Sequence, residues 1–280
     1  MEKQRRSGVR VDPPEVEIRG IVRSPSKFRD RLMIAIGMTG LVRAEWALSR
    51  WGQVIPCNWQ QLDYIMWMDT YAPLGWMVAD WRNMAVKELL EKNIQTMVFI
   101  DHDVILPPDF YIKMNERLIK ERVPIWSGLY FTKSFPAEPI LYRGKSTGFF
   151  ADWKMGDKVW VNAIPMGCTV IHSSIFKALW DESEEYKLGN QIVRRVFDSP
   201  RKAWEDPESH AWMTRTGTED LDFCWKVIEK GIFKKAGWPE YQKKKYPILC
   251  DTSIFCRHIT DDGTMYPSRG EDQYFRRKGK

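Results

Sequence analysis

Short apolar runs alternate with amphipathic segments along the first half of the chain. Mainly apolar runs at 32–36, 64–68, 97–100 and 124–128 have the length of strands buried on both faces. Between these runs, apolar residues recur at helical spacing. The predicted helical stripes are Leu41, Ala44, Leu48 and Trp51; Val78, Trp81, Ala85 and Leu89; and Phe110, Met114 and Leu118.

The pattern changes after residue 130. Pro and Gly interrupt the segment 131–161, and the runs at 159–161 and 166–171 predict an antiparallel or mixed insertion. Residues 182–215 are polar and irregular, which is typical of a functional loop such as a mobile lid. A helix should follow from Thr218 to Gly231, and then a late strand at 247–250.

Strands alternating with helices predict an α/β fold. We expect a Rossmann-like, mixed and mostly parallel sheet with helices on both faces and a small antiparallel insertion. The 280 residues are enough for one large domain, at 29–265. Residues 1–28 lack periodicity and predict a flexible N-terminal arm, and residues 266–280 form a basic C-terminal tail.

The composition of the chain indicates the cellular environment of the protein more than its activity. The net charge is +6, partly from the two ends, which favours phosphates or anionic surfaces or is only solubilising. The 14 tryptophans suit core packing or stacking on sugars or bases. No apolar run reaches the roughly 18–20 residues of a membrane span, and no signal peptide is recognisable. We therefore expect a cytoplasmic protein, or one of the host cytoplasm if the chain comes from a phage.

The five cysteines are widely spread and include no C-x-x-C pair. This usage predicts reduced thiols rather than a disulfide framework. Cys250, Cys256 and His258 form a weak candidate for a zinc site, because the usual close pair of cysteines is missing.

Two acids directly follow the third apolar run. Asp101 and Asp103 flank His102 at the expected C-terminal end of a buried strand. Residues i and i+2 of an extended chain point to the same side, so the two carboxylates should face one site. Ligands of open α/β sheets bind at this end of the strands, and carboxylates suit Mg²⁺ or Mn²⁺. The alternative interpretation is a solvated turn.

Three further segments contain groups suited to phosphate or proton chemistry. The turn at 37–40 separates a strand from a helix, a unit that places backbone N–H groups beside a nucleotide. Arg82 and Asn83 either lie on a solvated helix face or reach a diphosphate, which guanidinium groups bind well. Glu219 and Asp220 open a helix, where acids are also favourable for dipole reasons alone.

Taken in order, these segments resemble GT-A-fold glycosyltransferases, particularly the family-two-like group and its compact phage and bacterial relatives. The resemblance extends from about residue 30 to about residue 260 and rests on Gly37-Met38-Thr39-Gly40, Arg82-Asn83, Asp101-His102-Asp103, Gly217-Thr218-Glu219-Asp220 and His258. It implies sugar transfer from a nucleotide-sugar donor to the hydroxyl of a glycan, a lipid or another acceptor. It also implies Mn²⁺ or Mg²⁺ as cofactor and no nucleic-acid partner.

The resemblance assigns roles to individual residues. At the metal, the resemblance implies that Asp103 is a direct ligand and that His258, late in the sequence, is a further ligand. Asp101 would contact the metal, its bound water or the ribose. At the donor, the resemblance places Gly37, Thr39 and Arg43 beside the nucleoside. It places Arg82 and Asn83 near the diphosphate.

For the acceptor, the resemblance implies a general base. Asp220 is the first choice and Glu219 the second, for an inverting transfer. Retaining enzymes share the fold and need no such base, so the stereochemical outcome stays open at this point.

Two other classes of protein fit part of the pattern. A sugar nucleotidyltransferase also needs two acids and a metal, but it usually has a Gly-rich loop with Arg or Lys after the first strand, which residues 37–43 match poorly. A non-enzymatic carbohydrate- or nucleic-acid-binding protein would use the tryptophans and the basic ends. Such a protein would not require Asp101, Asp103 and Asp220 together.

Overall fold

The computed structural model describes residues 32–38, 40–56, 64–69, 76–145, 147–208 and 210–271. The predicted N-terminal arm, Thr39, Cys57 and most of the predicted C-terminal tail lie outside these residues. The strands are β1 (Leu32–Gly37), β2 (Tyr64–Asp69), β3 (Thr96–Ile100), β4 (Val104–Ile105), β5 (Ile125–Leu129), β6 (Lys158–Val161), β7 (Cys168–His172), β8 (Glu185–Leu188), β9 (Gln191–Arg194), β10 (Arg201–Glu205), β11 (Trp212–Thr216), β12 (Ile248–Phe255), β13 (Arg257–Ile259) and β14 (Met265–Tyr266). The helices are α1 (Ala44–Trp51), α2 (Val78–Glu91), α3 (Phe110–Lys120), α4 (Ser173–Asp181), α5 (Glu219–Glu229), α6 (Ile232–Lys235) and α7 (Pro239–Gln242).

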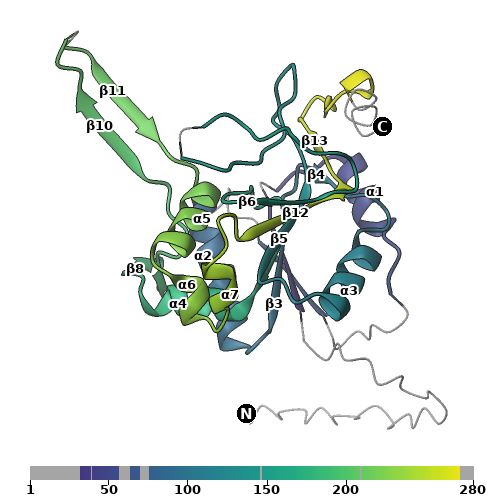
Figure 1. Cartoon of the computed structure of the whole chain (residues 1–280), viewed down its shortest axis with the longest axis horizontal. Helices are drawn as coiled ribbons and strands as arrows, with labels where there is room; N and C mark the ends of the chain where they lie inside the picture. The colour runs from purple at the N-terminus through teal and green to yellow at the C-terminus, as the bar shows by residue number, and fades with distance from the viewer. Residues whose placement is uncertain are drawn as a thin grey trace, which may run out of the picture.

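A seven-stranded sheet in the order β2-β1-β3-β7-β5-β12-β6 forms the centre of the molecule (Figure 1). Strands β2, β1 and β3 are parallel to one another, and β5 is parallel to β12. Strand β7 is antiparallel to both β3 and β5, and β6 is antiparallel to β12. Five strands therefore run one way and two run the other, which confirms the predicted mixed, mostly parallel α/β fold.

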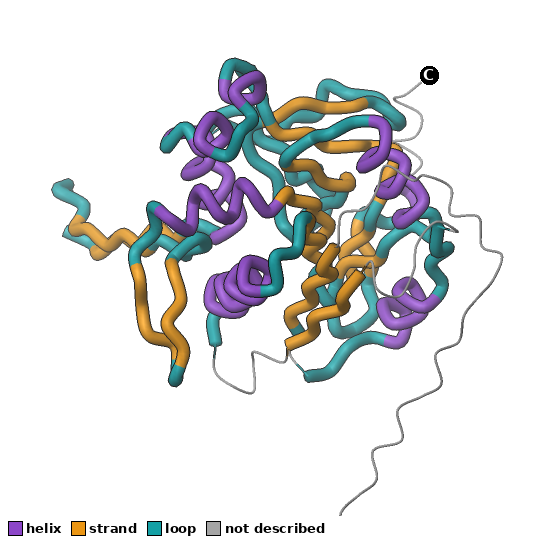
Figure 2. Tube along the Cα trace, turned by 90° about the horizontal axis from the view of Figure 1, so that it is seen from below, coloured by secondary structure: helices purple, strands orange, loops and turns teal. Residues whose placement is uncertain are grey.

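Alternate residues of the central strands pack into two hydrophobic cores. In β3, Met97 and Phe99 join the core that contains residues of α2, α4, α5 and α6. Val98 and Ile100 join the other core, which contains residues of α1 and α3. Figure 2 shows the helices on both sides of the sheet. Every residue of β3 is buried, as its uninterrupted apolar run predicts.

The apolar stripe predicted for the first helix does not face the core. Leu41, Leu48 and Trp51 are 87%, 66% and 83% exposed. Instead, α1 buries Trp46 and Arg50, and the Arg50 guanidinium donates to the hydroxyl of Tyr111 in α3. The spacing predicted the helix correctly but its buried face wrongly, because a long Arg side chain can pack inward when its charge finds a partner.

The segment 182–215 is also more regular than predicted. It forms two antiparallel hairpins, β8–β9 and β10–β11. Both lie on the α2 side of the sheet, and β10–β11 extends away from the body of the molecule (Figures 1 and 2). Strands β8 and β9 are largely exposed, so they lack the apolar alternation from which a half-buried strand is recognised.

The cysteines agree with the prediction of reduced thiols where the structure describes them. Cys168, Cys224, Cys250 and Cys256 are free and buried. Cys250 and Cys256 belong to different hydrophobic cores, and among the described residues no group of three or more His, Cys, Asp or Glu could hold a metal ion there. Within the described ranges, no helix is long and apolar enough to cross a membrane.

Candidate functional site

Strand β3 ends in a turn that several backbone contacts fix in place. The carbonyl oxygen of Asp101 accepts hydrogen bonds from the Val104 N–H (3.2 Å) and from Trp46 Nε1 (2.9 Å). The Asp101 N–H donates to the carbonyl of Gly167 (3.1 Å), next to β7. Because residues 102 and 103 lie in a turn, the extended geometry assumed for Asp101 and Asp103 is wrong.

Gly167 allows a close approach of three segments at this turn. A Cβ atom at residue 167 would lie 2.7 Å from the hydroxyl oxygen of Tyr130 and 3.0 Å from Oδ2 of Asp101. The Gly167 N–H donates to the same Tyr130 hydroxyl (2.7 Å). Neither Gly167 nor Tyr130 is predicted as a site residue from the sequence, since each matters only through contacts between distant segments.

Arg82 connects the two acidic motifs. Its guanidinium Nη2 donates to both carboxylate oxygens of Asp101, at 3.0 and 3.2 Å, and its Nη1 donates to Oε1 of Glu219 at 2.5 Å. The side chain of Arg82 is 2% exposed, against 25% for Asp101 and 14% for Glu219. A cation from α2 thus joins an acid at the end of β3 to an acid at the start of α5.

The surroundings of Arg82 are aromatic as well as acidic. The guanidinium carbon lies 5.5 Å from the ring centre of Trp81, 5.8 Å from that of Phe99 and 5.9 Å from that of Phe197. Burial alone would lower the pKa of Arg82, but the nearby carboxylates, chiefly Asp101 and then Glu219, raise it above its ordinary value. Arg82 is therefore a fixed positive charge, and the interpretation of a solvated helix face is wrong.

Asn83 is buried beside Arg82 and holds another part of the chain. Its amide donates to the carbonyl of Phe197 (2.9 Å) and to the hydroxyl of Tyr186 (3.1 Å), and its oxygen accepts from the Phe197 N–H (2.8 Å). These contacts anchor the segment between the two hairpins to α2. The contact of Asn83 with a diphosphate stays a prediction.

The second acid of the D-x-D motif meets the late histidine. Strand β13 pairs with β4 so that His258 lies opposite Val104, and the Ile259 N–H donates to the Asp103 carbonyl (2.8 Å). The Asp103 carboxylate lies 2.5 Å from Nζ of Lys133, which follows β5. The structure therefore brings together Asp103 and His258, as predicted, and adds Lys133, which the sequence analysis missed.

The ring of His258 is oriented by two contacts. Its Nδ1 lies 2.5 Å from the carbonyl oxygen of Phe131, and its ring packs nearly perpendicular to that of Tyr130, with centres 4.8 Å apart. A carbonyl oxygen can only accept, so Nδ1 carries the proton and Nε2 keeps its lone pair in the neutral ring. Burial, supported by the charge of Lys133, lowers the pKa of His258 although Asp103 opposes the shift.

The pKa of the Asp103 carboxyl is lowered, which is the opposite of the change that burial alone would cause. Burial alone would raise the pKa of its carboxyl, but His258 and Lys133 outweigh burial and lower it. Asp103 is therefore ionised at neutral pH. An anionic carboxylate next to a neutral imidazole is a donor set that suits Mn²⁺ or Mg²⁺.

The acids of α5 occupy different surroundings. Glu219 points to Arg82, whereas the Asp220 carboxylate accepts from the Leu221 N–H (2.8 Å) at the start of the helix. Burial raises the pKa of Glu219, and the neighbouring charge of Asp220 adds to this effect while Arg82 opposes it. Thr218 occupies the N-cap position, but its side chain makes no capping hydrogen bond.

Asp220 lies close to two tyrosines. Burial raises the pKa of Tyr130 and of Tyr142, and in both cases the charge of Asp220 raises it further. The charge of Asp220 therefore acts on Tyr130, whose hydroxyl contacts Gly167 at the D-x-D turn. The two motifs predicted to form one site are brought together, with Arg82 and Tyr130 between them.

The first turn is described only in part. A Cβ atom at Gly37 would lie 2.2 Å from the Trp81 ring, so this glycine lets α2 pack against the end of β1. Arg43 pairs with Glu45 (2.7 Å) and donates to the carbonyl of Asp261 (3.2 Å). Thr39 lies outside the described residues. The nucleoside contacts of these three residues stay predictions.

Among the described residues, the protein alone does not supply a complete set of metal ligands. In the part of the chain that the structure describes, no group of three or more His, Cys, Asp or Glu side chains could hold a metal ion. Asp103 and His258 offer one carboxylate and one imidazole. Further ligands would have to come from water or from the substrate, as is common for Mg²⁺ at phosphates.

No family model and no curated protein matches the chain. Solved structures that are similar to it include the following two. A197 from STIV shares 17% identity over 84% of this chain and 92% of that chain, with a TM-score of 0.47. GalNAc-T7 with UDP, GalNAc and Mn²⁺ shares 9% identity over 84% of this chain and 44% of that chain, with a TM-score of 0.44. At these scores neither likeness assigns a function to this chain.

Proposed function

We propose that the protein is a metal-dependent glycosyltransferase that moves a sugar from a nucleotide-diphosphate-sugar donor to an acceptor hydroxyl, with inversion. The observation that carries this proposal is the Arg82 bridge between Asp101 and Glu219 at the carboxyl end of β3. It joins the D-x-D turn to the acids of α5. Open α/β sheets bind their ligands at this end.

Asp103 and His258 would hold Mn²⁺ or Mg²⁺ together with phosphate oxygens of the donor. The bond from His258 Nδ1 to a backbone carbonyl supports this role, because metal-binding imidazoles are commonly oriented in this way. When bound, the cation supplies positive charge for the departing diphosphate. Lys133, beside the Asp103 carboxylate, adds a second positive charge at the same place.

Arg82 and Asp101 would position the donor. Arg82 acts as a positioning residue, because it holds the Asp101 and Glu219 carboxylates at fixed places. Asp101, held in this way, would contact the ribose or a water bound to the metal. Gly37, Thr39 and Arg43 would border the nucleoside.

Asp220 would be the general base. Glu219 is paired with Arg82, which leaves Asp220 as the better candidate to take a proton from the attacking hydroxyl. As the acceptor oxygen bonds to the anomeric carbon, the bond to the diphosphate breaks on the opposite face. The proton goes to Asp220 and the electron pair of the broken bond leaves with the nucleoside diphosphate, so the configuration inverts.

Calorimetry with UDP and GDP in the presence of Mn²⁺, followed by a panel of nucleotide sugars, tests this proposal. We expect one nucleotide to bind and its sugar conjugate to release nucleoside diphosphate. Asp103→Asn should weaken the Mn²⁺-dependent binding by at least tenfold, about 1.4 kcal/mol. Asp109→Asn, at a half-exposed acid that pairs with Lys113 (2.9 Å), is the matched control and should bind normally.

Two results would contradict the proposal. One is the failure of every nucleotide to bind with Mn²⁺, or equal binding by folded Asp103→Asn. The other is release of pyrophosphate from a nucleoside triphosphate and a sugar phosphate, which would identify a nucleotidyltransferase instead.

A further inference from the structure

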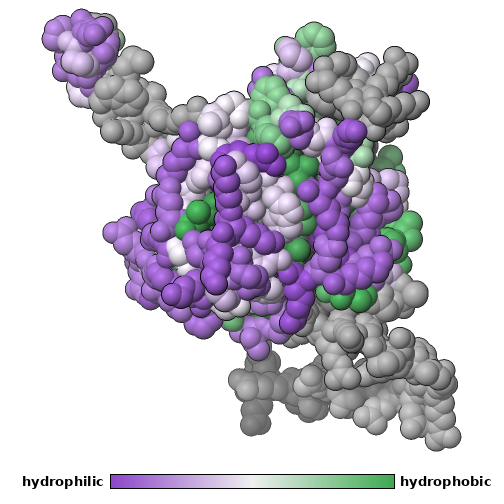
Figure 3. Space-filling view, viewed as in Figure 1, coloured by the Kyte–Doolittle hydropathy of each residue, from purple (hydrophilic) through white to green (hydrophobic). Residues whose placement is uncertain are grey.

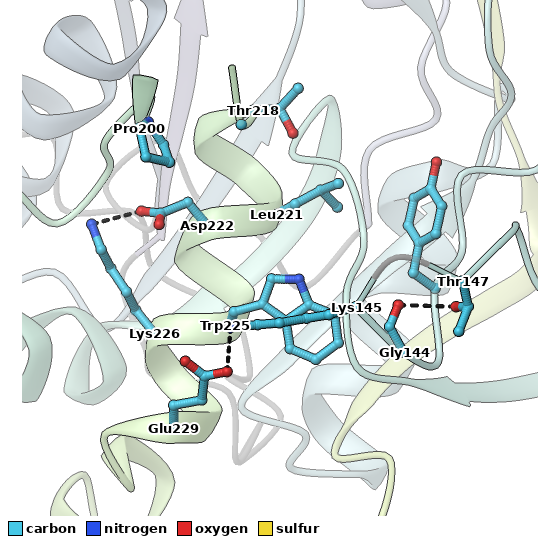
Figure 4. A pocket seen from close by; sticks show the side chains of 12 residues that line it. Gly144, Lys145, Thr147, Pro200, Thr218, Leu221, Asp222, Trp225, Lys226 and Glu229 are labelled. Atoms are coloured by element: carbon cyan, nitrogen blue, oxygen red, sulfur yellow. Dashed lines mark hydrogen bonds and ion pairs between the residues drawn. The ribbon is translucent and has the colours of Figure 1, made fainter. Parts of the chain in front are cut away.

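A groove of about 560 Å³ runs along α5 beside the candidate active site (Figure 4). Leu221, Trp225 and Glu229 follow one another at i, i+4 and i+8 on the face of α5 that lines it. Tyr142 and Lys145 also line the groove, from the segment before β6. Together with Pro200, which precedes β10, three segments far apart in the sequence form the groove.

One end of the groove lies beside the residues that precede the proposed general base in the sequence. Gly217 and Thr218 line that end, and they directly precede Glu219 and Asp220. Tyr142 lies close enough to Asp220 to feel its charge. A molecule that filled the groove would thus place one of its ends beside the start of α5, the helix that carries Asp220.

The groove combines an aromatic lining with polar groups. Leu221, Trp225 and Tyr142 are partly buried and present apolar surface. An indole ring offers a flat face for the C–H groups of a sugar ring, and the polar atoms around it can bond to hydroxyls. The Lys145 Nζ lies over the Trp225 ring, 5.5 Å from its centre, so a sugar that stacks on this ring would lie beside the ammonium group or displace it. Thr147 and Thr218 add two hydroxyl groups to the lining.

The charges along the groove are balanced. Lys226 lies 2.6 Å from the Asp222 carboxylate, and Lys145 lies 2.5 Å from the Glu229 carboxylate (Figure 4). Each cation is therefore neutralised by an adjacent acid. Such a lining gives no net attraction to a polyanion, and four charged side chains disfavour a lipid chain.

The face of the molecule seen in Figure 3 is mostly hydrophilic, with small hydrophobic areas between charged ones. A protein partner usually needs a larger apolar area than this. The size and the lining of the groove are those of a small-molecule site.

We infer that this groove binds the acceptor, and that the acceptor is a neutral oligosaccharide whose sugar ring stacks on Trp225. The acceptor role of this oligosaccharide rests on the proposed function, whereas the binding of an oligosaccharide in the groove does not. Trp225 would hold a sugar unit away from the reacting hydroxyl, so it determines which acceptor binds and takes no part in donor binding.

Fluorine NMR of the fluorotryptophan-labelled full chain tests the inference directly. The Trp225 signal is assigned with Trp225→Phe, and the probes are the hexaoses of glucose in α and β linkage, of mannose and of N-acetylglucosamine. We expect at least one probe to shift the Trp225 signal while that of Trp180, which lines a different hollow between α2 and α4, stays in place. A heparin hexasaccharide is the anionic comparison and should cause no shift.

Variants make the test quantitative. Trp225→Ala should weaken binding of the responding hexaose by about tenfold, the order expected for the loss of an aromatic contact. Its affinity for nucleotide with Mn²⁺ should not change, and Trp180→Ala should affect neither. Trp225→Phe, which keeps an aromatic ring, should retain most of the hexaose binding and covers the case in which the Ala variant is poorly folded.

The outcomes separate this inference from the proposed function. If no neutral hexaose shifts the Trp225 signal, or if only heparin does, the inference is wrong even when nucleotide and Mn²⁺ bind. If a hexaose binds at Trp225 but no nucleotide binds, the groove is an oligosaccharide site and the proposed transfer is wrong.

Discussion

Arg82 is the residue on which the geometry of the candidate site depends most. A buried guanidinium with two carboxylate partners fixes the distance between the end of β3 and the start of α5. Its planar fork can bond two acids at once, which a lysine ammonium cannot do with the same geometry. The site is therefore assembled around a permanent charge.

Replacing Arg82 by Met tests this role through stability. The change removes the charge and leaves Asp101 and Glu219, which are 25% and 14% exposed, without their partner. Loss of one partner of a buried ion pair typically costs about 3–5 kcal/mol, so the free energy of unfolding in urea should fall by about 3 kcal/mol at neutral pH.

The matched control is Lys120→Met, at an exposed helix position paired with Glu116 (3.5 Å). Exposed ion pairs contribute little, so this change should stay below about 1 kcal/mol. Equal unfolding midpoints and slopes for the two variants would contradict the buried bridge.

At the scale of elements, the end of β1 and the start of α2 are in unusually close contact. A Cβ atom at Gly37 would overlap the Trp81 ring at 2.2 Å, whereas one at Gly148 would meet nothing within 4 Å. Gly37→Ala should therefore destabilise the fold by about 1–3 kcal/mol through overpacking. Gly148→Ala is the control and should be close to neutral.

Thermal unfolding of both glycine variants gives the comparison. Trp81→Phe, combined with Gly37→Ala, should recover part of the loss because the smaller ring makes room for the methyl group. An unchanged midpoint for Gly37→Ala alone would show that α2 does not pack on β1 as described.

The elements that the sequence predicted well are those whose burial is uniform. Strand β3 is buried on both faces and was recognised from its apolar run, and α2 was recognised from its stripe. The hairpins β8–β9 and β10–β11 are not predicted, and in β8 and β9 most side chains are exposed or half-buried, so no buried face imposes a pattern. In α1 the stripe was real but faces away from the core, because Arg50 finds a buried partner in Tyr111.

At the scale of the whole molecule, the candidate site is a product of topology. Strand β7 lies between β3 and β5 and so brings Gly167 to Asp101, and the pairing of β13 with β4 brings His258 to Asp103. The order of motifs predicted that the acids would meet. The partners Lys133, Tyr130 and Gly167 could not be predicted, because they carry no local pattern and depend on long-range pairing.

In the proposed transfer, two adjacent acids have different roles. Glu219 pairs with Arg82, and Asp220 lies near Tyr130 and Tyr142, next to the groove along α5. Successive residues of a helix point about 100° apart, so only one of the two can face the acceptor. The assignment of Asp220 as base follows from this difference in partners.

Asp220→Asn, with nucleotide–Mn²⁺ affinity and sugar transfer measured on the same preparation, tests the central claim most directly. Asn keeps the shape of the side chain but cannot take a proton, so affinity should stay nearly unchanged while the transfer rate falls by about 10²–10⁴-fold. Glu219→Gln is the comparison and should retain more transfer. Near wild-type transfer by both folded variants would contradict the inverting, base-assisted mechanism.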